Sequence, residues 1–124
     1  MLLTFTLPKF ENLIKSGVKK HTIRVDKTNR WEVGRKIEFW KGNPRNVKSN
    51  PYQFGTGEVD RILHIEIHPE TNQIIIGADC YNNTEVLNKV AVSDGFENWE
   101  EMKTFFTEKT IGKLIFWKDF KATN

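Results

Sequence analysis

Five polar side chains that could do chemistry follow one glycine in the stretch SGVKKHTIR, residues 16 to 24. Lys19, Lys20, His21, Thr22 and Arg24 supply two ammonium groups, an imidazole, a hydroxyl and a guanidinium. Amide hydrolysis needs a nucleophile, a base that activates it and an acid for the leaving amine. A lysine can activate a threonine hydroxyl when burial and nearby cations lower its pKa, and Lys20 and Arg24 would act on Lys19 in this way. Thr22 is therefore a candidate nucleophile and Lys19 its candidate base.

His21 ranks behind Lys19 as a candidate base. Successive side chains of a strand point to opposite faces, so alternation places Thr22 and Arg24 on one face and His21 on the other. Alternation also places Lys19 opposite Thr22, so a shared site requires the chain to reorient Lys19 at Gly17. A purely structural explanation stays open, because threonine is a good strand former and the lysines could be solvated.

Positive charge is concentrated in the first part of the chain. Residues 9 to 48 hold 12 Lys or Arg against 4 Asp or Glu, a balance of +8, and residues 49 to 124 hold 7 against 12, a balance of −5. The two sum to the net charge of +3. A segregated basic segment favours an anionic partner, most often nucleic acid, although it can also be a solvated face without a partner.

Aromatic residues interleave with these cations, a pattern that suits backbone phosphates together with stacked, unpaired bases. Trp31 lies in a predicted loop and is the better candidate to stack on a ligand, whereas Trp40 ends a predicted strand and could equally belong to the core. We therefore predict RNA or a nucleotide as the partner. The predicted binding residues are Lys19, Lys20, Arg24, Trp31, Arg35, Lys41 and Arg45.

No metal or cofactor is predicted. His64 and His68 in the stretch HIEIH invite a metal, but four residues of strand separate them by roughly 13 Å, too far to share one ion. Cys80 is the only cysteine, which excludes an internal disulfide and a thiolate zinc site. Because Cys80 follows a predicted buried strand, we expect it to be packed and inert.

The elements that must position these residues follow from hydrophobic spacing and turn residues. Pro8 and Gly17 suit the two ends of one helix, and Asn98 with Glu101 forms a capping-box pattern at the start of another, whose apolar face continues to Phe106 through Phe105. The predicted elements are strands over 2–6, 21–25 and 36–40, two strands between 54 and 78, a strand over 113–120, and helices after Pro8, from about Thr84 and after Asn98. The order β-α-β-β-β-β-α-α-β predicts an α+β fold: a partly closed, mixed β-barrel of five or more strands with about three helices.

Length and composition predict one domain, residues 1 to 124, because the chain is too short for two independent cores. No apolar run approaches the roughly 20 residues that cross a bilayer, and the start MLLTFTLPKF shows no basic leader or cleavage site. The expectation is a cytoplasmic protein without a membrane partner. The oligomeric state is left open.

The spacing Gly17-x-Lys19-x-x-Thr22-x-Arg24 resembles the G-x-K-x-x-[E/T]-x-R signature of ASCH domains, a family of PUA-like β-barrels. The resemblance covers nearly the whole chain. It includes the opening strand and helix, the VGRKIEFW strand after a glycine turn, and an A…(D/E)GF element ahead of a late helix. In this sequence that element spans residues 91 to 96 and contains Asp94.

The resemblance implies a cleft between barrel and helices that holds RNA, a nucleotide or a modified base. Small bacterial amidohydrolases that deacylate N4-acetylcytidine are similar in carrying Thr in the signature, and their catalytic Lys, Thr and Glu map onto Lys19, Thr22 and Asp94. Asp94 departs from this pattern, because its side chain is one methylene shorter than Glu. We predict an RNA- or nucleotide-binding domain, with this amidohydrolase as the first alternative and a ribonuclease or a protein-interaction domain as further ones.

Overall fold

A computed structural model describes residues 1–123 of the chain. Within them, seven strands and three α-helices follow one another in the predicted order, with one additional short strand, β6. The elements are β1 (Leu2–Phe5), α1 (Lys9–Lys15), β2 (His21–Arg24), β3 (Lys36–Lys41), a 3-10 turn η1 (Val47–Ser49), β4 (Tyr52–His68), β5 (Gln73–Ile76), β6 (Asp79–Tyr81), α2 (Thr84–Ser93), α3 (Trp99–Phe105) and β7 (Thr110–Ala122). The predicted α+β class is confirmed.

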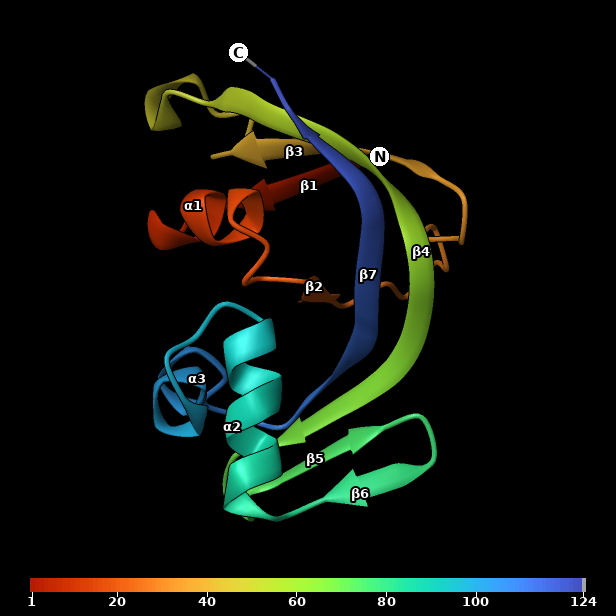
Figure 1. Ribbon diagram of the computed structural model, residues 1–124, viewed down its shortest axis with the longest axis vertical. Coiled ribbons are helices and arrows are strands. Elements are labelled where there is room, and N and C mark those ends of the chain that lie inside the picture. The colour runs from red at the N-terminus through yellow and green to blue at the C-terminus, as the bar shows by residue number, and fades with distance from the viewer. Residues whose placement is uncertain (124) are drawn as a thin grey trace.

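The strands form one mixed sheet that curves around the core (Figure 1). Strand β1 pairs in parallel with β3, and the remaining pairs are antiparallel: β3 with β4, β4 with β5 and β7, β5 with β6, and β2 with β7. The long strands β4 and β7 run side by side and give the sheet its curved wall (Figure 1). All three helices lie on the concave side of this wall (Figure 1).

The sheet is barrel-like but open. Strands β1 and β2 end the path β1-β3-β4-β7-β2 and do not pair with each other among the described strands. The side chain of Arg24 in β2 instead donates from Nη2 to the backbone oxygen of Thr4 in β1, at 2.8 Å. This hydrogen bond from the Arg24 side chain therefore connects β1 and β2, which do not pair through their backbones.

Local sequence signals explain where the helices begin and end. Pro8 stands at the start of α1, and Gly17 adopts a φ of +82° just beyond its end, a conformation that glycine adopts without strain. The Asn83 side chain accepts from the backbone N–H of Glu85 at the start of α2. Asn98 accepts from the backbone N–H of Glu101 at the start of α3, each at 2.8 Å. The capping role predicted for Asn98 is confirmed.

Apolar side chains fill the space between the curved sheet and the helices. Strands β4 and β5 contribute Ile65, Ile67 and Ile74, each fully buried, and α3 contributes Met102. None of the helices within residues 1–123 is long and apolar enough to cross a membrane.

Two sequence expectations about packing are wrong. Phe105 does not continue the buried face of α3, since 51% of its surface is exposed where the helix ends. Cys80 is exposed, because it lies on β6, which pairs only with β5 among the described strands. Both residues lie at the end or edge of an element, where the period of the sequence pattern no longer fixes which side chains are covered.

Candidate functional site

The turn after helix α1 directs Lys19 into the protein. The backbone N–H of Lys19 donates to Leu13 O at 2.9 Å, and that of Lys20 donates to Ser93 O at 2.8 Å, which fastens this segment to the end of α2. Lys19 is then 1% exposed and is among the largest fully buried side chains of residues 1–123. Gly95 makes room for it, because an added Cβ there would lie 3.0 Å from Lys19 Cδ.

The ammonium group of Lys19 is surrounded by oxygen atoms and one aromatic face. Its Nζ donates to the backbone oxygen of His21 at 2.9 Å and to the backbone oxygen of Asp94, and lies 3.5 Å from Asp94 Oδ1. The ring of Phe10 lies below it, 4.3 Å from Nζ to the centroid. Burial lowers the pKa of Lys19 from 10.5 to about 8, an effect that Asp94 opposes and Arg24 reinforces.

Asp94 joins Lys19 to His21. It follows the last residue of α2, and its Oδ1 lies 2.9 Å from Nδ1 of His21. All three residues are buried: Lys19 is 1% exposed, His21 4% and Asp94 3%. We call Lys19, His21 and Asp94 the buried cluster. Alternation could have placed Lys19 and His21 on one face, because they are two residues apart, but nothing local in the sequence brings Asp94 to them.

Thr22 and Arg24 are placed differently from this cluster. Thr22 is 3% exposed and pairs with Ile115 in β7, and within residues 1–123 its hydroxyl makes no hydrogen bond to Lys19 or Asp94. The guanidinium of Arg24 donates to the backbone oxygens of Ile23 and Thr4, and burial lowers its pKa. The structure therefore brings Lys19 and Asp94 together but does not join Thr22 to them.

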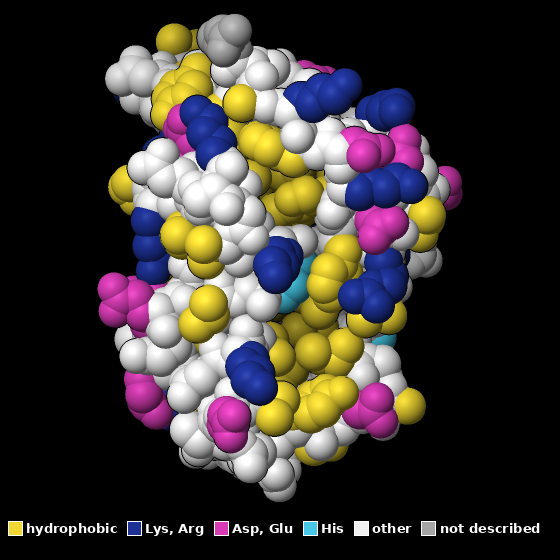
Figure 2. Space-filling view, in the orientation of Figure 1, with side chains coloured by type: hydrophobic (Ala, Val, Ile, Leu, Met, Phe, Trp, Pro, Cys, Tyr) yellow, Lys and Arg dark blue, Asp and Glu magenta, His cyan; other side chains and the backbone are white. Residues whose placement is uncertain are grey.

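A hollow of about 520 Å³ opens between the end of α1 and strand β7. Figure 2 shows hydrophobic side chains along a depression on this face, with lysine or arginine side chains at its sides and a histidine over the region of β2. Four lysines and two aspartates line the hollow, a local balance of +2. Its charged and aromatic lining residues are Lys15, Lys19, Lys20, Asp60, Phe116, Trp117, Lys118, Asp119 and Phe120.

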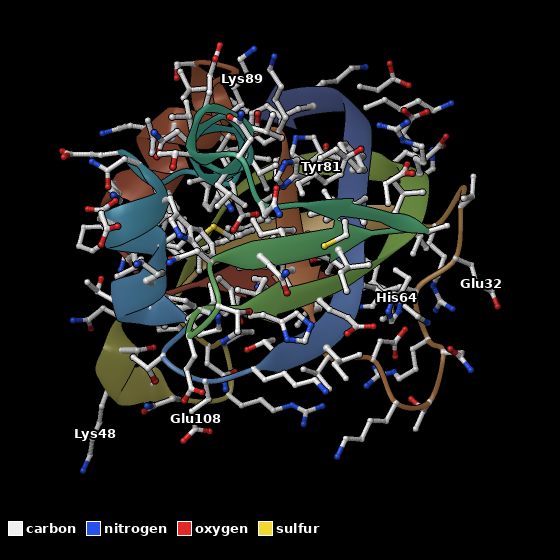
Figure 3. The ribbon with its side chains drawn as sticks, turned by 90° about the horizontal axis from the view of Figure 1, so that it is seen from below. Glu32, Lys48, His64, Tyr81, Lys89 and Glu108 are labelled. Carbon is white, nitrogen blue, oxygen red and sulfur yellow. The ribbon has the colours of Figure 1, made fainter. Side chains whose placement is uncertain are left out.

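The other predicted binding residues lie elsewhere. Arg35 and Arg45 are exposed, Lys41 donates from Nζ to the backbone oxygen of Thr6, and none of the three belongs to the described lining of the hollow. Lys48 and Glu32, both from the basic segment, project at opposite edges of the view in Figure 3. The charged residues of the segment 9 to 48 therefore lie on different sides of the molecule, because the chain changes direction several times within that segment.

Trp31 is buried in the core with 8% of its surface exposed, which corrects its prediction as a base-stacking residue. The carboxylate of Asp26 causes this placement. It accepts from the backbone N–H groups of Arg30 and Trp31, at 2.9 and 2.8 Å, and so turns the loop back toward the sheet. A polar loop sequence predicts exposure, but a tight turn inside the loop can bury one residue of it.

A second group of titratable side chains, His64, Glu66 and His68, lies on strand β4. We call it the exposed cluster, although only His64 is fully exposed and Glu66 and His68 are half-buried. Both histidines donate from Nε2 to the Glu66 carboxylate, at 2.9 Å from His64 and 3.0 Å from His68. Figure 3 shows His64 near the outer side of the sheet. The rings thus approach each other more closely than strand spacing alone suggests, yet no group of three ligands suited to a metal occurs among residues 1–123.

Comparisons of the chain with protein-family models, with curated proteins and with solved structures find no significant match in any of the three. The likeness to ASCH domains therefore stays a prediction from the signature residues.

Proposed function

We propose that this protein binds a nucleotide, or a short stretch of single-stranded RNA, in the hollow between α1 and β7. The observation that supports the proposal most is that lysines and aromatic side chains line the same hollow. Its volume of about 520 Å³ lies within the range of small-molecule sites, roughly 300 to 1,000 Å³. Lysines attract phosphate, and aromatic rings offer a face on which a base can stack.

The lysines of the hollow are not equivalent. Lys20 is exposed and forms no ion pair within residues 1–123, so its ammonium group is available to a phosphate. Lys118 is also exposed and forms an ion pair with Glu58 at 3.5 Å, with which a phosphate would compete. Lys19 is fully engaged inside the protein and supports the floor of the hollow.

The aromatic side of the hollow comes from β7. Phe116, Trp117 and Phe120 are partly buried, so each keeps some accessible surface. The guanidinium of Arg61 lies 4.2 Å from the centroid of the Phe116 ring. Stacked guanidinium and aromatic groups of this kind bind unpaired bases without a requirement for one sequence.

Titration of the intrinsic tryptophan fluorescence, to which Trp117 contributes, with adenosine monophosphate and with a short single-stranded RNA tests the proposal. Binding should weaken as salt is raised, because phosphate contacts release counterions. The double variant Lys20→Gln/Lys118→Gln should bind about tenfold more weakly and depend less on salt. The matched control Lys27→Gln/Lys109→Gln removes the same charge from two exposed lysines outside the hollow and should bind like the wild type. Equal weakening in both pairs, or no binding at all, would contradict the proposal.

One observation favours a second function, deacylation of an N4-acylated cytidine as the signature implies. The pKa of Lys19 is lowered to about 8, and a neutral lysine could take the proton of Thr22 while the hydroxyl attacks the acyl carbon. The C–N bond would then break as the lysine returns that proton to the cytosine amine, and water would hydrolyse the acyl-threonine ester to acetate and free threonine. The Thr22 hydroxyl, however, makes no hydrogen bond to Lys19 within residues 1–123. Release of acetate from N4-acetylcytidine that is lost in Thr22→Val, with nucleotide binding retained, would establish this function in addition to binding.

A further inference from the structure

His21 adjoins the hollow through Phe116, which lines it, and only one of its two ring nitrogens has a hydrogen-bond partner among residues 1–123. Its Nδ1 is 2.9 Å from Asp94 Oδ1, whereas Nε2 makes no hydrogen bond within residues 1–123. The ring meets that of Phe116 edge-on at 5.0 Å, and both Phe116 and Lys20 line the hollow. The ring is 4% exposed, so a ligand can meet it only at a ring edge.

Asp94 determines which nitrogen of His21 carries the proton. A carboxylate only accepts hydrogen bonds, so Nδ1 must donate, and the lone pair of the neutral ring then lies on Nε2. The ammonium of Lys19, 3.5 Å from the same oxygen, already offsets the negative charge of Asp94. In the neutral ring Nε2 is therefore an acceptor.

We propose that Nε2 of His21, oriented by Asp94, accepts a hydrogen bond from an amino group on the base of the bound nucleotide. The hollow then prefers adenine and cytosine, which carry an exocyclic amino group, over hypoxanthine and uracil, which carry a carbonyl oxygen there. An acceptor that faces a carbonyl leaves both groups without a partner. This inference rests on the proposed nucleotide binding and adds a preference among bases to it.

Two matched ligand pairs test the preference at constant pH and salt. Adenosine monophosphate should bind about tenfold more tightly than inosine monophosphate, and cytidine monophosphate about tenfold more tightly than uridine monophosphate, the effect of one hydrogen bond. Calorimetric titration of the wild type measures all four. If the four bind within twofold of one another, the inference is overturned and the proposed function stands. If none binds, both fail.

The variant His21→Phe keeps a ring against Phe116 but removes both nitrogens. Its preference for the amino ligands should disappear, so that all four nucleotides bind to it within twofold of one another. His64→Gln is the matched control, because it removes an imidazole from the exposed cluster and should keep the full preference. A preference that survives in His21→Phe overturns the inference.

The tautomer of His21 provides a test that does not depend on a folded variant. Long-range ¹⁵N–¹H correlation spectra of the wild type should show the proton on Nδ1 and a non-protonated Nε2. Addition of adenosine monophosphate should shift the Nε2 resonance, and addition of inosine monophosphate should shift it much less. A proton on Nε2 in the free protein overturns the inference.

Discussion

The buried cluster and the exposed cluster both pair histidine with a carboxylate at almost the same distance, 2.9 Å in one and 2.9 and 3.0 Å in the other. Their surroundings differ. Asp94 is 3% exposed, whereas the side chain of Glu66 is 23% exposed. Burial dominates the pKa shift of Lys19 in the first cluster, and hydrogen bonds from His64 and His68 dominate the lowered pKa of Glu66 in the second.

Hydrogen bonds of similar length therefore affect stability differently in the two clusters. Inside the protein, a charge that loses its partner has no water to replace it, so each member depends on the others. At the surface, water replaces a lost partner at little cost. The sequence pattern of the exposed cluster, HIEIH, is easier to notice. A single substitution in the buried cluster should nevertheless reduce the stability of the protein more.

The largest effect is expected from Lys19→Met, which leaves the buried carboxylate of Asp94 without its cation. At pH 7 the free energy of unfolding should fall by about 3 kcal/mol, because Asp94 and two backbone oxygens lose their donor and removal of the buried charge offsets only part of that loss. Urea denaturation measures it. Lys27→Met, at an exposed lysine, should change stability by no more than about 0.5 kcal/mol. A similar small change for Lys19→Met would show that burial does not separate the two clusters.

The pH dependence of stability should also distinguish the buried cluster. The pKa of Lys19 is about 8 in the folded protein and 10.5 in a free side chain, so between these values the unfolded chain binds more protons. Stability should therefore rise with pH over this window, by up to about 3 kcal/mol from this group alone. The difference in unfolding free energy between the wild type and Lys19→Met, measured as a function of pH, isolates the contribution of Lys19. If the two proteins show parallel curves from pH 7.5 to 9.5, the buried ammonium does not titrate there.

Gly95 offers an intermediate test of how tightly the buried cluster is enclosed. An added Cβ would lie 2.8 Å from the Phe10 ring and 3.0 Å from Lys19 Cδ, at a φ of +101°. Gly95→Ala should cost about 2 to 3 kcal/mol. Gly17→Ala, at a φ of +82° with no atom within 4 Å, should cost only the backbone strain, about 1 kcal/mol. Equal losses of Tm would mean that the cavity around Lys19 is loose.

The smallest effect is expected from Glu66→Gln in the exposed cluster. The lowered pKa of Glu66 means that its ionised form contributes stability above its ordinary pKa of 4.5, and that this contribution is lost as pH falls through the lower folded value. Glu66→Gln should therefore lower Tm slightly at pH 7 and hardly at all at pH 3. A loss at pH 7 as large as that of Lys19→Met would remove the contrast between the clusters.

Much of the fold could be predicted because its signals are local. Asn98 caps α3 by accepting from Glu101, Gly17 ends α1, and the run of isoleucines predicted the strand β5, although only Ile74 of that strand is fully buried. Phe105 and Cys80 were predicted wrongly because burial at the end or edge of an element depends on what covers it. Trp31 was also predicted wrongly, because its burial follows from two hydrogen bonds to Asp26 that composition does not indicate.

The candidate site was only partly predictable for a related reason. The signature residues Lys19 and Asp94 meet in the structure although 75 residues separate them. His21 was ranked low as a functional residue because alternation places it on the opposite face from Thr22. In the structure its partner is Asp94, which also contacts Lys19. The lining from β7 was missed altogether, since nothing in the stretch KLIFWKDF shows which strand or helix lies opposite it.

The sequence by itself determined the order of the elements, the α+β class and the positions of helix ends, because neighbouring residues carry those signals. Only the tertiary structure decided which charges are buried and which polar groups meet: it placed Lys19 inside, Arg24 across the open edge of the sheet, and Trp31 in the core. Burial and long-range contacts depend on the whole chain at once, and they decide whether a lysine is an ordinary surface cation or one whose pKa is near 8.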